Sequence, residues 1–314
     1  MLLILLVILV VIALVHARIY VREAEQGVPP AGEFRIIDGI KLHYLDAGPR
    51  DSLQAPVVLI HGVSSNMLDM KLALGDRLAE RRRVIMLDRP GFGYSERPPG
   101  EVDMGRQAKI IETLMAELGV EKPVIIAHSY GGALALRHTL DFPGRAQALI
   151  LLAPVSHRWP GGVDWHNHAA TTPGIGPLFS YTVPALYGRL AGKKAVKQAF
   201  WPQAQPAGYY EKAGMALIFR PTAFRSTGED LVGLYDEITN MEPHYGSIRQ
   251  PVHMLAGTHD TTVLSTIHCF GLKAKVADTS LQFFDNVGHT IHHACGDEVD
   301  KLLSSLDANV DVQG

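Results

Sequence analysis

Three residues of types that support nucleophilic catalysis occur along the chain in the order Ser129, Asp260 and His289. A serine hydroxyl is a poor nucleophile at neutral pH unless a histidine accepts its proton. That histidine in turn needs a carboxylate, which fixes the imidazole tautomer and stabilises its charged form. If the fold brings these three side chains together, they predict a reaction that passes through a covalent intermediate on the serine.

Ser129 lies where an apolar run ends and a helical pattern begins, in the stretch VIIAHSYGGALALRH (residues 124–138). One interpretation is a nucleophile on a strained strand-to-helix turn, and the other is an ordinary turn that carries a serine. Asp260 and His289 also follow apolar runs, and functional groups of open parallel sheets collect at the carboxyl ends of strands. This shared placement favours the interpretation of Ser129 as a nucleophile. The competing acids and histidines, which are less well placed, are Asp236, Asp285, His292 and His293.

The elements that must position these residues alternate between short apolar strands and helices. The segment FRIIDGIKLHYLDAG (residues 34–48) predicts a hairpin around an Asp-Gly turn. Continuous apolar strands separated by helices follow, which is typical of a parallel sheet covered on both faces. We therefore expect an α/β core formed by residues 33–155 and 250–308.

Between the two halves of this core, residues 156–249 lose the strand-and-helix rhythm and are rich in aromatic residues, proline and glycine. We interpret this segment as a helical lid (cap) rather than an independent domain. Part of its aromatic set should line an apolar pocket across from the sheet, which favours a small-molecule substrate with an acyl or aromatic portion. The aromatic residues considered are Trp159, Trp165, Phe179, Tyr181, Phe200, Trp201, Tyr209 and Tyr210.

Five short motifs along the chain resemble those of the α/β-hydrolase fold family, in its lid-bearing serine hydrolase form. The resemblance covers roughly Phe34 to Leu306. The sequence departs from the G-x-S-x-G elbow at one position, because Ala127 replaces the first glycine. Alanine is still small enough for close packing of the strand against the helix. In their order along the chain, the motifs are His61-Gly62, the turn from Asp88 to Ser95, Ala127-His128-Ser129-Tyr130-Gly131, Gly257-Thr258-His259-Asp260 and Gly288-His289.

The resemblance implies a mostly parallel sheet with helices on both faces and an inserted helical lid. It also implies a catalytic triad of Ser129, Asp260 and His289, with an oxyanion hole formed by the backbone N–H groups of Val63 and Tyr130. The expected activity is that of a carboxylesterase or lipase-like serine esterase. The alternatives are a non-catalytic binding protein of the same fold, or a C–C hydrolase, lyase or perhydrolase that uses the same triad.

His61 is interpreted as a structural histidine that holds the oxyanion loop. A catalytic metal is not expected, because no H-E-x-x-H motif occurs. The histidines that could serve as ligands in that alternative are His166, His168, His289, His292 and His293. No cofactor is expected either, since the Gly91-Phe92-Gly93 turn lacks the third glycine of a dinucleotide-binding loop.

The N-terminus differs in character from the rest of the chain. Met1 to Val15 is unbroken aliphatic sequence, and Arg18 and Arg22 follow it. We predict a single-pass membrane anchor over residues 1–21 and a linker over 22–32, with the globular part placed in the cytoplasm by the positive-inside rule. If the segment were instead a cleaved signal peptide, the protein would be periplasmic or secreted. The third alternative is a helix buried in the core, because fifteen residues without a polar face would need burial all round.

The overall composition excludes several classes of protein. The chain has 314 residues, 47% of them hydrophobic, which is enough for a large core. A net charge of −3 gives no reason to expect nucleic acid as a partner. Cys269 and Cys295 are too few for a disulfide framework and are interpreted as buried thiols.

Overall fold

The computed structural model describes residues 1–100 and 102–311 of the chain. Its centre is an eight-stranded sheet in the order β1-β2-β4-β3-β5-β6-β7-β8. The predicted hairpin forms β1 and β2, which run antiparallel to each other, and β2 is also antiparallel to β4. All other neighbouring strands are parallel. The strands are Glu33–Ile37 (β1), Ile40–Ala47 (β2), Val57–Ile60 (β3), Val84–Leu87 (β4), Val124–His128 (β5), Ala148–Leu152 (β6), Val252–Gly257 (β7) and Thr279–Phe284 (β8).

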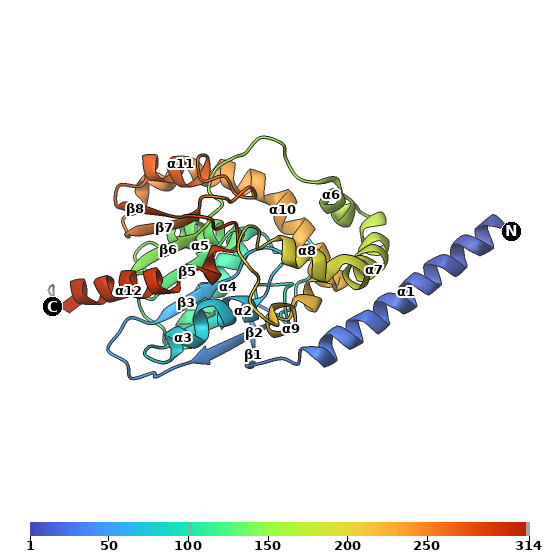
Figure 1. The fold of residues 1–314 in the computed structure, drawn as a ribbon, viewed down its shortest axis with the longest axis horizontal. Coiled ribbons are helices and arrows are strands. Elements are labelled where there is room, and N and C mark those ends of the chain that lie inside the picture. The colour runs from blue at the N-terminus through green and yellow to red at the C-terminus, as the bar shows by residue number, and fades with distance from the viewer. Residues whose placement is uncertain (101, 312–314) are drawn as a thin grey trace.

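The central strands are buried on both faces, which explains their continuous apolar sequences. Val57 of β3 pairs with Val84 on one side and Val124 on the other. Alternate residues enter opposite cores: Val58 and Ile60 pack into one cluster, whereas Val57 and Leu59 pack into the other. The sheet therefore separates two apolar layers (Figure 1).

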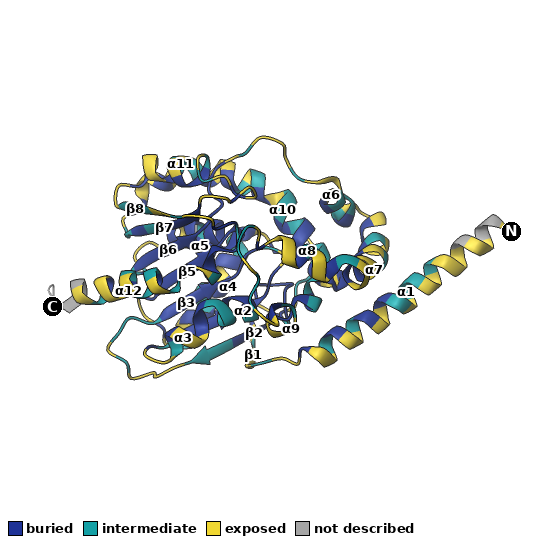
Figure 2. Cartoon of the chain, viewed as in Figure 1, coloured by how far each residue is buried: buried dark blue, intermediate teal, exposed yellow. Residues whose placement is uncertain are grey.

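Helices on the two faces bury these layers. Residues of α4, α5 and α11 contribute to one core, and residues of α2, α3 and α12 contribute to the other. Figure 2 shows the resulting pattern, with buried strands in the middle and exposed residues on the outer sides of the helices. These helices are Met67–Met70 (α2), Asp76–Ala79 (α3), Met104–Glu117 (α4), Tyr130–Asp141 (α5), His268–Lys275 (α11) and Gly296–Asp311 (α12).

The segment between β6 and β7, which we call the insert (residues 156–249), is helical and lies on one end of the sheet (Figure 1). Its longest helix, α10, runs from the insert back toward the core and contributes Leu234 and Ile238 to the core that contains α4 and α5. The elements of the insert are Trp165–Thr171 (α6), Ile175–Tyr187 (α7), Gly188–Gly192 (η2), Lys193–Gln198 (α8), Tyr209–Lys212 (α9), Met215–Phe219 (η3), Pro221–Met241 (α10) and Glu242–Ser247 (η4).

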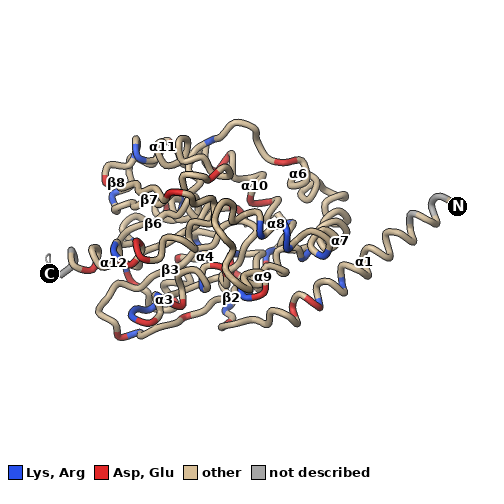
Figure 3. Tube along the Cα trace, viewed as in Figure 1, with Lys and Arg blue, Asp and Glu red and all other residues tan. Residues whose placement is uncertain are grey.

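The predicted membrane anchor and membrane localisation are wrong. Within the described residues, no helix is both long enough and apolar enough to cross a membrane. The aliphatic run is part of a longer helix, α1 (Leu2–Gly27), which also contains two arginines and two glutamates. Figure 3 places these charges on the part of α1 nearest the rest of the molecule.

The second half of α1 is amphipathic and packs against the insert. Ala17, Tyr20 and Ala24 recur at helical spacing and are buried with residues of α7, α8 and η3. The Tyr20 hydroxyl donates a hydrogen bond to the Ala216 carbonyl over 3.1 Å. The helix therefore continues to Gly27 through the first part of the segment expected to be a linker.

Candidate functional site

Ser129 lies on a sharp turn between β5 and α5, with φ 54° and ψ −118°. This positive φ is uncommon for a residue other than glycine and indicates local backbone strain. The turn also needs small neighbours. A Cβ atom on Gly131 would lie 2.7 Å from the Ile60 carbonyl oxygen, and one on Gly132 would lie 2.7 Å from Pro154. The glycines after Ser129 therefore allow α5 to begin against the ends of β3 and β6.

The structure joins Ser129, His289 and Asp260 by hydrogen bonds. His289 Nε2 lies 3.0 Å from Ser129 Oγ, and His289 Nδ1 lies 2.8 Å from Asp260 Oδ2. Because the Asp260 carboxylate can only accept, Nδ1 carries the proton and Nε2 is free to accept one from the serine. This is the arrangement that an activated serine requires.

Asp260 is held as an anion by its surroundings. Its second oxygen accepts hydrogen bonds from the backbone N–H groups of Thr262 and Val263, over 2.8 and 2.9 Å. Burial alone would raise the pKa of Asp260. The hydrogen bond and charge of His289, together with the two amides, outweigh burial and hold the pKa below its usual value.

The loop after β3 lies against Ser129. A Cβ atom on Gly62 would come within 3.2 Å of Ser129 Cβ and 3.0 Å of His128 Nδ1, so the backbone approaches as closely as a glycine allows. Val63 follows at once and lines the same cavity as Ser129 and His289. The N–H of Val63 and that of Tyr130, the first residue of α5, are the candidate oxyanion donors.

His61 holds this loop and does not contact Ser129. Its Nδ1 donates to the Gly62 carbonyl over 2.7 Å, and its Nε2 accepts from the Arg89 backbone N–H over 3.0 Å. Burial, with a smaller contribution from the Arg89 charge, lowers the pKa of His61 to about 4. His61 is therefore a neutral structural side chain.

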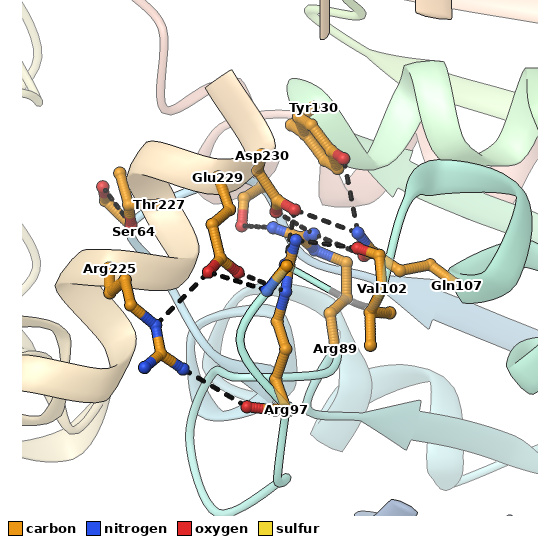
Figure 4. A network of polar contacts seen from close by, with 12 residues as sticks. Ser64, Arg89, Arg97, Val102, Gln107, Tyr130, Arg225, Thr227, Glu229 and Asp230 are labelled. Carbon is orange, nitrogen blue, oxygen red and sulfur yellow. Dashed lines mark hydrogen bonds and ion pairs between the residues drawn. The ribbon is translucent and has the colours of Figure 1, made fainter. Parts of the chain in front are cut away.

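Arg89 connects the oxyanion loop to the insert (Figure 4). Its guanidinium donates to the carbonyls of His61 and Gly62, each over 3.1 Å, and to Asp230 of α10 over 2.6 Å. Arg97 also contacts Asp230 over 2.6 Å. Burial favours the neutral form of Asp230, but the two arginines outweigh it and lower its pKa. Sequence reasoning missed Asp230, because no motif marks a residue that is 141 positions from its partner.

The competing histidines His292 and His293 contact a different carboxylate, Asp69. Their Nε2 atoms lie 3.0 and 2.8 Å from its two oxygens, and Tyr209 and Ser65 donate to the same carboxylate, each over 2.8 Å. Asp69, His292 and His293 could together hold a metal ion. The four hydrogen bonds already satisfy the carboxylate, however, so the cluster is explained as a polar network beside the site.

His128, the residue before Ser129, contacts the backbone of His289. Its Nε2 lies 2.9 Å from the His289 carbonyl oxygen and donates to it. Burial, followed by the charges of His292 and His289, lowers the pKa of His128 well below its ordinary value. His128 therefore stays neutral and fixes the main chain at His289.

Ser129 and His289 open into a cavity of about 690 Å³ beneath the insert. Four of the predicted aromatics line it, and they are Trp165, Phe179, Phe200 and Tyr209. The sequence did not single out three further aromatic lining residues, which are Tyr187, Phe219 and Phe224. Other predicted aromatics pack elsewhere: Trp159 lies against Tyr235, and Trp201 lies against His259. A second cavity, of about 570 Å³, is lined by none of Ser129, Asp260 and His289.

This chain belongs to the α/β-hydrolase fold family, whose model matches residues 55–293. The predicted family and fold class are thereby confirmed. An uncharacterized protein of Mycobacterium tuberculosis is 25% identical over 291 residues, which cover 87% of this chain and 80% of that protein.

Two solved structures share the fold. A bacterial membrane phospholipase A superposes with a TM-score of 0.67 at 22% identity, covering 99% of this chain and 97% of that one. The enol-lactonase from Burkholderia xenovorans superposes with a TM-score of 0.69 at 18% identity, covering 87% and 99%. Identities this low establish the common architecture and leave the reaction to the residues of the site.

Proposed function

We propose that this protein is a serine hydrolase that cleaves an ester-type bond through an acyl-enzyme intermediate. The observation that supports this most directly is the hydrogen-bonded series from Asp260 through His289 to Ser129 at a cavity large enough for a substrate. Relatives of the fold that open epoxides use an aspartate as nucleophile, whereas this chain has a serine at the elbow.

In the acylation step, Ser129 Oγ attacks the ester carbonyl carbon while His289 Nε2 accepts the hydroxyl proton. The negative oxygen that forms would accept hydrogen bonds from the amides of Val63 and Tyr130. The C–O bond to the alcohol then breaks, and His289 passes the proton to the departing oxygen. The product is an acyl group bonded to Ser129 and a free alcohol.

In the deacylation step, His289 takes a proton from water as the water oxygen bonds to the acyl carbon. Collapse of the second tetrahedral intermediate breaks the bond to Ser129 Oγ, which receives the proton back. Asp260 remains ionised throughout, and its low pKa favours the charged histidine that forms twice in the cycle.

A fluorophosphonate probe tests this proposal, because it reacts quickly only with an activated serine. We expect the purified protein to be labelled once, at Ser129, and we expect Ser129→Ala to abolish both labelling and ester hydrolysis. Ser64→Ala is the matched control: Ser64 lines the same cavity, but its hydroxyl contacts Thr227 instead of a histidine. Ester hydrolysis by Ser129→Ala at a near wild-type rate would disprove the assignment. An unlabelled, inactive wild-type protein would favour the non-catalytic alternative.

A further inference from the structure

The cavity at Ser129 is walled mainly by hydrocarbon. Residues of α7, α8, η3 and α10 form its far side, opposite the ends of the strands. Apolar surface dominates this lining, so a bound group gains most of its affinity by leaving water. The apolar and aromatic side chains that contribute are Phe179, Val183, Tyr187, Val196, Phe219 and Phe224.

The charged residues around the cavity also limit which substrates can bind. Among the described residues that line it there is no lysine or arginine, and the one carboxylate is that of Asp69. Asp69 is anionic: burial would raise its pKa, but His292 and His293 outweigh burial and hold it well below the usual value. Burial also lowers the pKa values of His128 and His292, although the charge of Asp69 opposes the shift at both.

A negatively charged substrate group would therefore have no described lysine or arginine to pair with in this cavity. It would also face the carboxylate of Asp69. Moving an unpaired ion out of water into such surroundings is strongly unfavourable. Substrates with a second carboxylate on the acyl side should consequently be rejected.

We infer that the acyl group of the substrate is an uncharged aliphatic chain of medium to long length, and this inference rests on the proposed ester hydrolysis. A cavity of about 690 Å³ holds on the order of 20 non-hydrogen atoms, at the ~30 Å³ that a water molecule occupies in the liquid. That is room for an octanoyl or decanoyl chain together with part of the alcohol. Hydrolysis adds water across the ester and produces a carboxylic acid beside Ser129, which releases its proton to solvent at neutral pH and becomes a carboxylate. The product is then an anion in a cavity with no described lysine or arginine, which favours its release.

The acyl preference is tested with soluble p-nitrophenyl esters of two series. In the first series the chain grows from acetate to decanoate, and we expect kcat/KM to rise by up to about fourfold for each buried methylene until the cavity is full. The second compares p-nitrophenyl octanoate with the mono-p-nitrophenyl ester of suberic acid, which has the same length and ends in a carboxylate. We expect the suberate ester to be at least about 100-fold poorer in kcat/KM.

A matched pair of variants shows whether the chain occupies this cavity. Ala195 on α8 lines the cavity, whereas Lys194 beside it is exposed and is not one of the described lining residues. Ala195→Phe should shorten the optimal chain by several carbons, because the larger side chain fills part of the cavity. Lys194→Phe should leave the optimum unchanged.

The two proposals fail in different ways. An enzyme that labels at Ser129 but prefers acetate, or hydrolyses the suberate and octanoate esters equally well, would overturn the acyl preference and leave the serine mechanism in place. An unchanged chain-length optimum in Ala195→Phe would also overturn it. Loss of labelling, or hydrolysis that persists in Ser129→Ala, would overturn the proposed function itself.

Discussion

The substitution Asp230→Asn tests whether the buried contact between α10 and the oxyanion loop contributes to stability and catalysis. Asp230 lies between the guanidinium groups of Arg89 and Arg97, and the side chains of Arg89 and Asp230 are fully shielded from water. Removing the negative charge leaves Arg89 without its charged partner, whereas Arg97 keeps its ion pair with Glu229 at 2.9 Å. Breaking a buried pair in this way costs about 3 to 5 kcal/mol. Because asparagine can still accept hydrogen bonds, we expect the free energy of unfolding to fall by about 3 kcal/mol.

Urea unfolding followed by fluorescence measures this loss, with Asp236→Asn as the control. Asp236 is on the same helix but exposed, so its substitution should change the free energy of unfolding by less than about 0.5 kcal/mol. The proposed mechanism adds a second expectation. Arg89 holds the carbonyls of His61 and Gly62, so loosening it should lower kcat for ester hydrolysis by about tenfold and change KM less.

The pH dependence of this effect follows from the lowered pKa of Asp230. A carboxylate with a pKa lower in the folded than in the unfolded state contributes stability above its unfolded pKa, which is about 3.9. That contribution is lost as the pH falls through the folded pKa. The difference in unfolding free energy between wild type and Asp230→Asn should thus be constant from pH 7 to about 5 and shrink below about pH 4. Equal stabilities of Asp230→Asn and Asp236→Asn at pH 7 would refute the reasoning.

The remaining predictions concern the triad and the elbow. His289→Ala should reduce kcat about as much as Ser129→Ala, and the double variant should be little worse than either, because members of a triad act as a unit. His292→Ala should reduce kcat by less than about tenfold, since its Nε2 contacts Asp69; the reverse ranking in steady-state kinetics would move the base to His292. Gly131→Ala should lower the free energy of unfolding by more than about 2 kcal/mol, because its Cβ would meet a backbone carbonyl at 2.7 Å. Gly233→Ala is its control on α10, where a Cβ meets nothing within 4 Å, and it should stabilise the protein by up to about 1 kcal/mol. Equal thermal stabilities for the two alanine variants would contradict the packing argument.

The order of apolar strands and helices was sufficient to predict the sheet and the place of the insert, because those patterns are local. The same is true of Ser129, Asp260 and His289: each follows a strand, and parallel strands bring such ends together. Their hydrogen bonds are in the structure, while their catalytic role stays a prediction.

Contacts between distant segments could not be read in the same way. Asp230 is one acid among many on an amphipathic helix, and only the fold shows that it meets Arg89. Asp69 likewise gains its histidine partners from a loop more than 220 residues away. The error at the N-terminus had a different source. The anchor predicted over residues 1–21 includes Ala17 and Tyr20, but these side chains pack on the insert, as part of an amphipathic helix that continues to Gly27.

The buried contact of Asp230 also limits the route by which a substrate enters. If α10 swung outward, the cations of Arg89 and Arg97 would lose their partner, at a cost of several kcal/mol for each opening. That helix should therefore act as a fixed wall during turnover. The entrance is then expected at the edge formed by α7 and α8. These helices contribute Val183 and Ala195 to the cavity, and no described ion pair joins them to Arg89. Exchange of backbone amide hydrogens should accordingly be fast in α7 and α8 and slow in the middle of α10.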